Sequence, residues 1–186
     1  MDGGAAYFGK IEGRDYANAR LTADLDERDA GSAICVIAPD RGAPSEEVEA
    51  LVTRSAATAA RVAPASILIV AAEPAEVASH LALVHSEFPR ARVIGVSEAS
   101  SERVVDMVDS IVLDRGTAFP CLVLCRGEYG IEDAFALVAC RLGARGVEEI
   151  VDERFSKDQL SKLQLSARSS GDIRSDIDRA REAREA

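Results

Sequence analysis

Two histidines are the first candidates for chemistry in this sequence. His80 and His85 are the only histidines, and both fall in a segment that is predicted to be helical. Residues five apart on a helix lie about 140° apart around its axis, whereas a helical metal-binding pair needs a spacing of four. We therefore expect a structural or surface role for each histidine, and no metal site.

Four cysteines are the next candidates, and three of them lie in apolar runs of the C-terminal half. If these runs are neighbouring strands, Cys121 and Cys125 share a face and Cys140 lies nearby, so a thiolate cluster could form. However, C-x-x-x-C without a turn is not zinc spacing, and free cysteine is among the most buried residue types. We predict buried packing, in a reducing compartment, because four cysteines in a chain of this size do not make a disulfide scaffold.

The remaining candidates lie in two loops. Glu73 and Glu76 flank Pro74 and could be paired catalytic carboxylates, but first-turn acids also stabilise a helix N-terminus, and we favour that interpretation. Arg41 could hold an anion, although a solvated loop arginine is the simpler interpretation. Ser45 has no histidine partner to act as a base, so nucleophilic catalysis is not supported.

The elements that position these residues alternate between apolar strands and amphipathic helices. Strands are predicted at 33–38, 66–72 and 92–96, and helices at 45–63, 74–88 and 100–113. Ser45 is the expected N-cap of the first helix, and Pro74 is the expected first residue of the second. In the third helix, Val112 is predicted to belong to the apolar face. This alternation indicates a parallel sheet with right-handed crossovers.

A different pattern follows in the last third of the chain. Three short apolar runs separated by glycine-bearing turns, at 119–126, 134–142 and 147–151, predict an antiparallel meander.

The C-terminal segment carries the clearest helix start. Ser156 and Gln159 have the spacing of a capping box, and Phe155 and Leu160 occupy the hydrophobic-staple positions around them. We expect Gly171 to break this helix and the charged end, 174–186, to be a solvated or frayed helix.

Composition limits the classes of partner. The chain has 186 residues, 47% of them hydrophobic and 29% charged, with a formal net charge of −10. These values fit one soluble domain, and the negative charge is a poor match for nucleic acid or an anionic membrane surface. The N-terminal stretch Met1-Asp2-Gly3-Gly4 has neither a basic region nor a hydrophobic signal core, so we expect a cytoplasmic protein.

The order of the segments resembles the lactate/malate dehydrogenase family. The stretch SILIVAAEPAEVASHLALVHSEFPRARVIGVS resembles the family's strand, Asn-Pro-Val-Asp turn, helix and "GFP-x-x-RVIG" strand. The runs VVDMVDSIVLD, FPCLVLCRGEYGIEDAFALVACRLGARGVEEIVD and FSKDQLSKLQLSA resemble its C-terminal helix, meander and final helix. GEYGI…LG…GVEEIV is the most specific piece. The resemblance covers about 10–167, in discontinuous blocks.

Several functional motifs of that family have no counterpart here. No G-x-G-x-x-G and no Gly-x-His-Gly-Asp occur, and the chain passes from Val96 almost directly into the helix that begins near Ser100. Glu73 stands where the family has an asparagine that contacts nicotinamide and substrate. Of the arginines in the family's mobile loop, only one has a plausible counterpart in this chain, which is Arg41. The resemblance therefore implies that the proton donor, the carboxylate clamp and the cofactor turn are all missing.

Together these features predict an α/β fold: a curtailed Rossmann-like parallel sheet with helices, followed by an antiparallel meander and an amphipathic helix. We expect a single domain over 1–186, with a partial Rossmann-like half (1–97), a dehydrogenase C-terminal-like part (98–170) and a charged tail (171–186).

The predicted function is non-catalytic binding or assembly, without a cofactor. The alternative is an NAD-dependent oxidoreductase of small 2-hydroxy acids that is weak or completed by a partner chain. A splice product or decayed gene product is a third interpretation. Any residual ligand or cofactor site should lie at the carboxyl ends of the first two strands, near Arg41, Glu73 and Pro74.

A final expectation concerns association. The family's counterpart of strand 33–38 is interior, so its missing neighbour would leave a sheet edge exposed in this chain. Either the segment 6–11 (AYFGKI) pairs with that edge, or another chain covers it. We favour a homo-oligomer or a heterocomplex through this edge.

Overall fold

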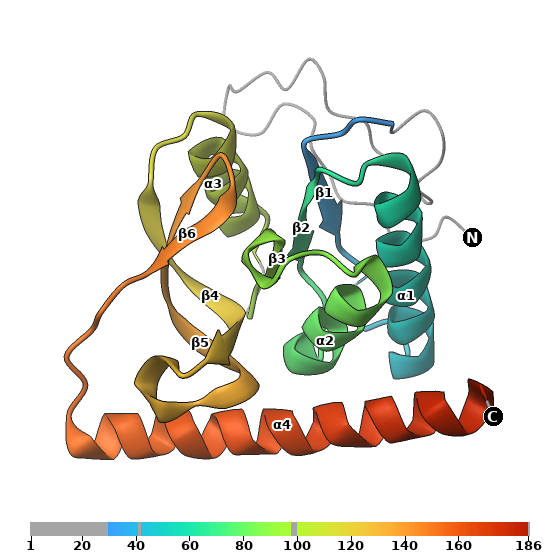
Figure 1. The fold of residues 1–186 in the computed structure, drawn as a ribbon. Helices are drawn as coiled ribbons and strands as arrows, with labels where there is room; N and C mark the ends of the chain where they lie inside the picture. The colour runs from blue at the N-terminus through green and yellow to red at the C-terminus, as the bar shows by residue number, and fades with distance from the viewer. Residues whose placement is uncertain (1–29, 41, 98–99, 186) are drawn as a thin grey trace.

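One mixed sheet of six strands organises the chain in the computed structural model, which describes residues 30–40, 42–97 and 100–185. The strands follow chain order from β1 to β6 (Figure 1). They are β1 (Ile34–Ile37), β2 (Ile67–Val70), β3 (Val93–Gly95), β4 (Thr117–Arg126), β5 (Glu132–Gly143) and β6 (Gly146–Ile150). The first three are parallel, and from β3 onward each pair is antiparallel. The predicted α/β class, parallel half and meander are confirmed.

Helices cover both faces of the parallel half. They are α1 (Ser45–Val62), α2 (Ala75–Ser86), α3 (Ser101–Val112) and α4 (Lys157–Glu185), with two 3₁₀ turns, η2 (Arg90–Arg92) and η3 (Glu128–Gly130). Cys35, Leu68 and Val70 face a core shared with α1 and α2. Ile69 and Ile94 face the opposite core, which also contains residues of α3 and the meander. Burial on both faces explains why these strands are continuous apolar runs.

The beginnings of two helices differ by one residue from the sequence prediction. Pro44 occupies the N-cap position of α1 without a side-chain bond, so Ser45 is the first helical residue and not the cap. Pro74 is likewise the N-cap of α2, which begins at Ala75. Proline's fixed φ suits either position at a helix start, so sequence alone does not separate them.

The third helix confirms its predicted start but not its whole apolar face. Ser100 is the N-cap of α3, and its hydroxyl accepts a hydrogen bond from the Arg103 N–H at 3.2 Å. Val112 was expected on the buried face, but its side chain is 62% exposed. Val112 is the last residue of the helix, one turn beyond the buried Val108, and Leu113 after it is also exposed.

The C-terminal helix confirms one prediction and contradicts another. The Ser156 N–H donates to Gln159 Oε1 at 2.8 Å, and the Gln159 N–H donates back to Ser156 Oγ at 3.2 Å, so the capping box is formed. Gly171 does not break the helix, because α4 continues to Glu185. A glycine costs a helix only about 1 kcal/mol, and the packing of α4 against β5, where Ala167 is 2% exposed, offsets that cost.

Strand β1 lies at one end of the sheet, and β2 is the strand partner that the structure describes for it. The segment 6–11, predicted as a pairing partner for this edge, lies outside the described residues. None of the helices in the described ranges combines the length and apolarity that a membrane span requires.

Candidate functional site

The carboxyl edge of the parallel strands is where the sequence places a ligand site. The chain leaves β1, β2 and β3 at this edge and enters α1, α2 and α3, so three helix N-termini face it (Figure 1). Of the residues predicted here, Glu73 and Pro74 are exposed in the β2–α2 turn, joined by a cis peptide bond. Arg41 lies outside the described residues. The structure therefore brings together only part of the predicted set.

Glu73 binds the start of its own helix. One carboxylate oxygen accepts a hydrogen bond from the backbone N–H of Ala75 at 3.2 Å. This N–H belongs to the first turn of α2 and has no partner within the helix. The contact is the one that the capping interpretation predicts, and it gives no support to a catalytic pair with Glu76, which lies in the first turn of α2.

The charges that the structure describes at this edge are mainly negative. Glu46 and Glu47 lie in the first turn of α1, and Glu102 lies in the first turn of α3. Arg103 is the basic exception, and its guanidinium donates a hydrogen bond to the carbonyl of Ser97 at 3.3 Å. Carboxylates at helix N-termini take the position in which an anionic ligand would otherwise be stabilised.

An apolar seam, formed by Ala75, Leu122, Leu124 and Phe135 with Leu83 at its margin, joins the parallel half to the meander where α2 packs against β4 and β5. Each of the first four residues is 2% exposed. Leu122 of β4 is also the backbone partner of Gly95, the last residue of β3. Direct strand pairing and side-chain packing therefore connect the two halves. Sequence reasoning missed this seam, because no local pattern shows which strand β3 will pair with.

The histidines lie away from this edge, within α2. His80 is only 2% exposed, and His85 is in the last turn of the helix. No group of three potential ligands that could hold a metal ion occurs among the residues the structure describes. The placement agrees with structural and surface roles for the two side chains.

The cysteines are all free and buried, as predicted. Cys121, Cys125 and Cys140 lie in the same core cluster, between the meander and α3. A hydrogen bond with Cys140 and burial raise the pKa of the Cys121 thiol far above its usual range. Burial raises the pKa of Cys125 to about 11. Because the thiolate is the nucleophile, the raised pKa values make the Cys121 and Cys125 thiols unreactive at neutral pH.

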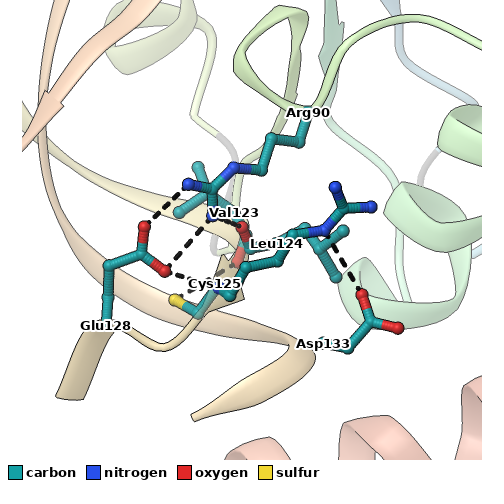
Figure 2. Close-up of polar contacts among 7 residues, drawn as sticks. Arg90, Val123, Leu124, Cys125, Glu128 and Asp133 are labelled. Carbon is teal, nitrogen blue, oxygen red and sulfur yellow. Dashed lines mark hydrogen bonds and ion pairs between the residues drawn. The ribbon is translucent and has the colours of Figure 1, made fainter. Parts of the chain in front are cut away.

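An ion pair that was not predicted joins η2 to the β4–β5 turn of the meander. Figure 2 shows the Arg90 guanidinium facing Glu128, with nitrogen–oxygen distances of 2.8 and 3.2 Å to the two carboxylate oxygens. Arg90 also donates to the carbonyl of Leu124 at 2.9 Å. The hydrogen bond from Arg90 is the main reason that the pKa of Glu128 falls to about 2. The two residues are 38 positions apart, so no local sequence spacing predicts the pair.

A hollow of about 770 Å³ lies elsewhere, between the start of β5 and α4. Glu132 and Asp133 line one side, and Gln164, Arg168 and Asp172 line the other. Gln164 donates to the carbonyl of Tyr129 at 2.8 Å, a contact that fixes α4 to the β4–β5 turn. The hollow is remote from the carboxyl edge and contains none of the predicted site residues.

Known proteins similar to this chain are malate dehydrogenases, although no protein-family model matches it. The enzyme of Chlorobium luteolum is 39% identical over 69 residues, which is 37% of this chain and 22% of the relative. That of Salinibacter ruber is 35% identical over 80 residues, 43% of this chain and 24% of the relative. The matched segment thus spans less than a quarter of these curated relatives.

Solved structures that are similar to this chain are also malate dehydrogenases. The Salinibacter ruber malate dehydrogenase has a TM-score of 0.72 at 20% identity, covering 87% of this chain and 79% of that chain. The Archaeoglobus fulgidus malate dehydrogenase, solved in complex with NADH, has a TM-score of 0.68 at 18% identity, covering 81% and 78%. At these identities the likeness establishes the fold.

Proposed function

We propose that this chain, which is similar to malate dehydrogenases in part of its sequence and in its fold, is a non-catalytic relative of the lactate/malate dehydrogenase family that acts by binding or assembly in the cytoplasm. Hydride transfer in such an enzyme needs a proton donor, a clamp for the substrate carboxylate and a bound cofactor. We propose that this chain supplies neither the proton donor nor the clamp for the substrate carboxylate.

The connection from β3 to α3 is the observation that carries the proposal. β3 ends at Gly95 and α3 begins at Ser101, so only residues 96–100 join them. The family resemblance places the catalytic segment at this point in the chain. Both histidines of the sequence are instead in α2, and His80 is buried there. The five residues of this connection include no histidine and no arginine, so the connection itself supplies neither an imidazole nor a guanidinium clamp.

Assembly is the second part of the proposal. β1 is the terminal strand of the sheet in the described part of the chain, and natural proteins rarely leave such strands uncovered. We place a homo-oligomer or heterocomplex contact at this edge. Light scattering on the purified protein at micromolar concentration tests the homo-oligomer, whose mass should be a multiple of 19.7 kDa. A monodisperse monomer that also captures no partner chain would contradict the assembly role.

An NAD-dependent oxidoreductase, weak or completed by a partner chain, is the second candidate. The likeness to the Archaeoglobus fulgidus enzyme solved with NADH favours it. Its cofactor would have to lie near Arg41, Glu73 and Pro74. If a dinucleotide binds there, Arg41→Ala and Glu73→Ala should each change its affinity, as measured by calorimetry. The same affinity in both variants would place the binding site elsewhere.

The donor set at the carboxyl edge does not fit a dinucleotide well. Glu73 already occupies the Ala75 N–H, and first-turn carboxylates face the edge from α1, α2 and α3. A pyrophosphate is bound by free backbone N–H groups at a helix N-terminus, where negative side chains would repel it. This mismatch favours the non-catalytic proposal over the oxidoreductase.

A further inference from the structure

We infer that the partner at the β1 edge is a second copy of this chain, whose own β1 pairs antiparallel with the first across a two-fold axis. The pairing would join two six-stranded sheets into one continuous sheet. The inference deepens the proposed function and rests on its assembly part, because it names the partner at that edge and the backbone groups that meet there.

Alternate residues of β1 direct their backbone groups to opposite sides. The carbonyls of Ala33 and Ile37 accept hydrogen bonds at 2.9 and 2.8 Å from N–H groups at the two ends of β2. Cys35 lies midway between them in the parallel register and bonds to β2 in the same way. The N–H and C=O groups of Ile34 and Val36 therefore point away from β2, and no strand of the described residues lies on that side.

The edge has none of the features that prevent strand pairing. Between Gly31 and Pro39 the sequence contains no charged residue and no proline. The register with β2 runs from Ile34 to Ile37 without a shift, so there is no bulge either. Natural proteins protect an edge strand by such features or else cover it. The side chains of Ile34 and Val36 are only partly buried, at the margin of a core cluster, so a neighbour would also cover apolar surface.

The sequence that precedes β1 is poorly suited to provide this cover. A hairpin partner would have to come from the residues just before Ala30, but five of the eight residues in 22–29 are charged, and aspartate is depleted in strands. The apolar segment 6–11 would need residues 12–33 as its connection, and irregular connections longer than about 15 residues are uncommon in compact domains. Both facts favour a partner from another chain.

A second β1 fits because the outward groups complement themselves. In an antiparallel pair centred on Cys35, Ile34 of each copy lies opposite Val36 of the other, and the two residues exchange hydrogen bonds. This register keeps all four bonding residues within β1. Ile34 and Val36 of the two copies are then cross-strand neighbours on one face, where each covers the exposed part of the other.

The charges of α1 suit the same two-fold arrangement. This helix packs on β1 through the core that contains Cys35 and Val48. It begins with Glu46 and Glu47, ends with Arg61, and exposes all three. A two-fold axis at Cys35 makes the two α1 helices antiparallel, so the acidic start of each lies on the side of the basic end of the other. Complementary charges favour this orientation over a parallel one.

Two variants with the same substitution test the surface. Val36→Lys adds a charge at the β1 edge, and Val147→Lys adds it at a partly buried residue of β6, at the other end of the sheet. Light scattering at about 100 µM would detect even a micromolar contact. We expect twice 19.7 kDa for the unmodified chain and for Val147→Lys, and 19.7 kDa for Val36→Lys. Equal masses for the two variants would overturn the inference.

An isotope-filtered NOE experiment on the unmodified chain tests the register without any substitution. In an equal mixture of labelled and unlabelled chains, the Cys35 Hα of one copy should contact the Cys35 Hα of the other, because directly opposed Cα atoms that are not hydrogen-bonded lie about 4.5 Å apart. This measurement decides even if Val36→Lys does not fold. An oligomer without the Cys35 contact overturns the inference and leaves the assembly role intact.

The other outcomes also separate the inference from the proposed function. A monomer at about 100 µM overturns the inference. If the Ile34 and Val36 amides of that monomer are protected from hydrogen exchange, a segment of the same chain closes the edge. A monomer that captures a different chain overturns the second copy but keeps the assembly role. Turnover of a 2-oxo acid by a dimer with the Cys35 contact overturns the non-catalytic role but not the strand pairing.

Discussion

The carboxyl edge of the parallel strands and the turn of the meander use polar side chains in opposite ways. At the edge, the contacts are local: Glu73 bonds to a residue two positions away, and Ser100 to one three positions away. In the meander, they connect distant segments, as Arg90 does with Glu128 and Gln164 with Tyr129. The edge merely caps its helices, whereas the meander fixes the tertiary structure. The difference teaches that, in the described residues, these polar contacts stabilise single helices at the edge and the tertiary structure in the meander.

The largest expected effect is on the apolar seam that joins α2 to the meander. Leu122→Ala should lower the free energy of unfolding by about 2–5 kcal/mol, because it leaves a cavity among fully buried side chains. Urea denaturation followed by circular dichroism measures the change. Leu137→Ala, on the next strand, should cost less than about 1 kcal/mol. If the two variants lose equal stability, the seam is not a packed core.

Two glycines provide the next comparison. Gly95→Ala should cost about 1–3 kcal/mol, since its Cβ would collide with Ser79 Oγ and Leu122. Gly171→Ala should instead stabilise the protein by about 0.5–1 kcal/mol, because alanine is the better helix former and its Cβ would lie 3.8 Å from Ala134. Thermal melts of the two variants should shift in opposite directions. A Gly95→Ala melting temperature at or above that of the unmodified chain would refute the packing of α2 on β3, whereas a lower melting temperature for Gly171→Ala would refute only the helix-propensity argument.

The Arg90–Glu128 pair should produce a measurable pH dependence. The pKa of Glu128 is about 2 in the folded chain, below its ordinary 4.5, so the carboxylate stabilises the fold above pH 4.5. That stability is lost as the pH falls from 4.5 towards 2. Because both side chains are partly exposed, we expect about 1 kcal/mol. Glu128→Gln should remove this part of the acid sensitivity in urea titrations at pH 6, 4 and 3, whereas Asp133→Asn should change it less.

The smallest effect belongs to the carboxyl edge. Glu73→Gln should lower the free energy of unfolding by about 0.5 kcal/mol, because the amide oxygen still accepts the Ala75 N–H but the negative charge at the N-terminus of α2 is lost. Denaturant titrations in low and high salt measure the loss, which salt should reduce. A cost above about 2 kcal/mol would show that Glu73 holds more than its own helix.

The sequence predicted most of the fold, because its evidence is local. Apolar runs bounded by glycine and proline gave β1, β2 and β3 within two residues, and the Ser156–Gln159 capping box marked the start of α4. The errors were at positions where tertiary packing, and not the local sequence pattern, decides the structure. Gly171 remained helical because α4 packs on β5, and Val112 is exposed at the last residue of α3, one turn beyond the buried Val108.

The site was less predictable than the fold. The Glu73 cap follows from its position before a helix, but the seam and the Arg90–Glu128 pair each depend on strand pairing between distant residues. Charge and residue type show which groups could meet, but not which ones do. The predicted single domain and the predicted contact through the β1 edge both stay predictions.

Steady-state reduction of oxaloacetate and pyruvate by NADH is the measurement that tests the central claim most directly. With the purified chain at tens of micromolar, we predict a rate no higher than that without protein, which corresponds to less than about 0.001 turnovers per second against a typical enzyme median of about 10. Turnover clearly above that background, and abolished by a substitution in this chain, would contradict the non-catalytic account.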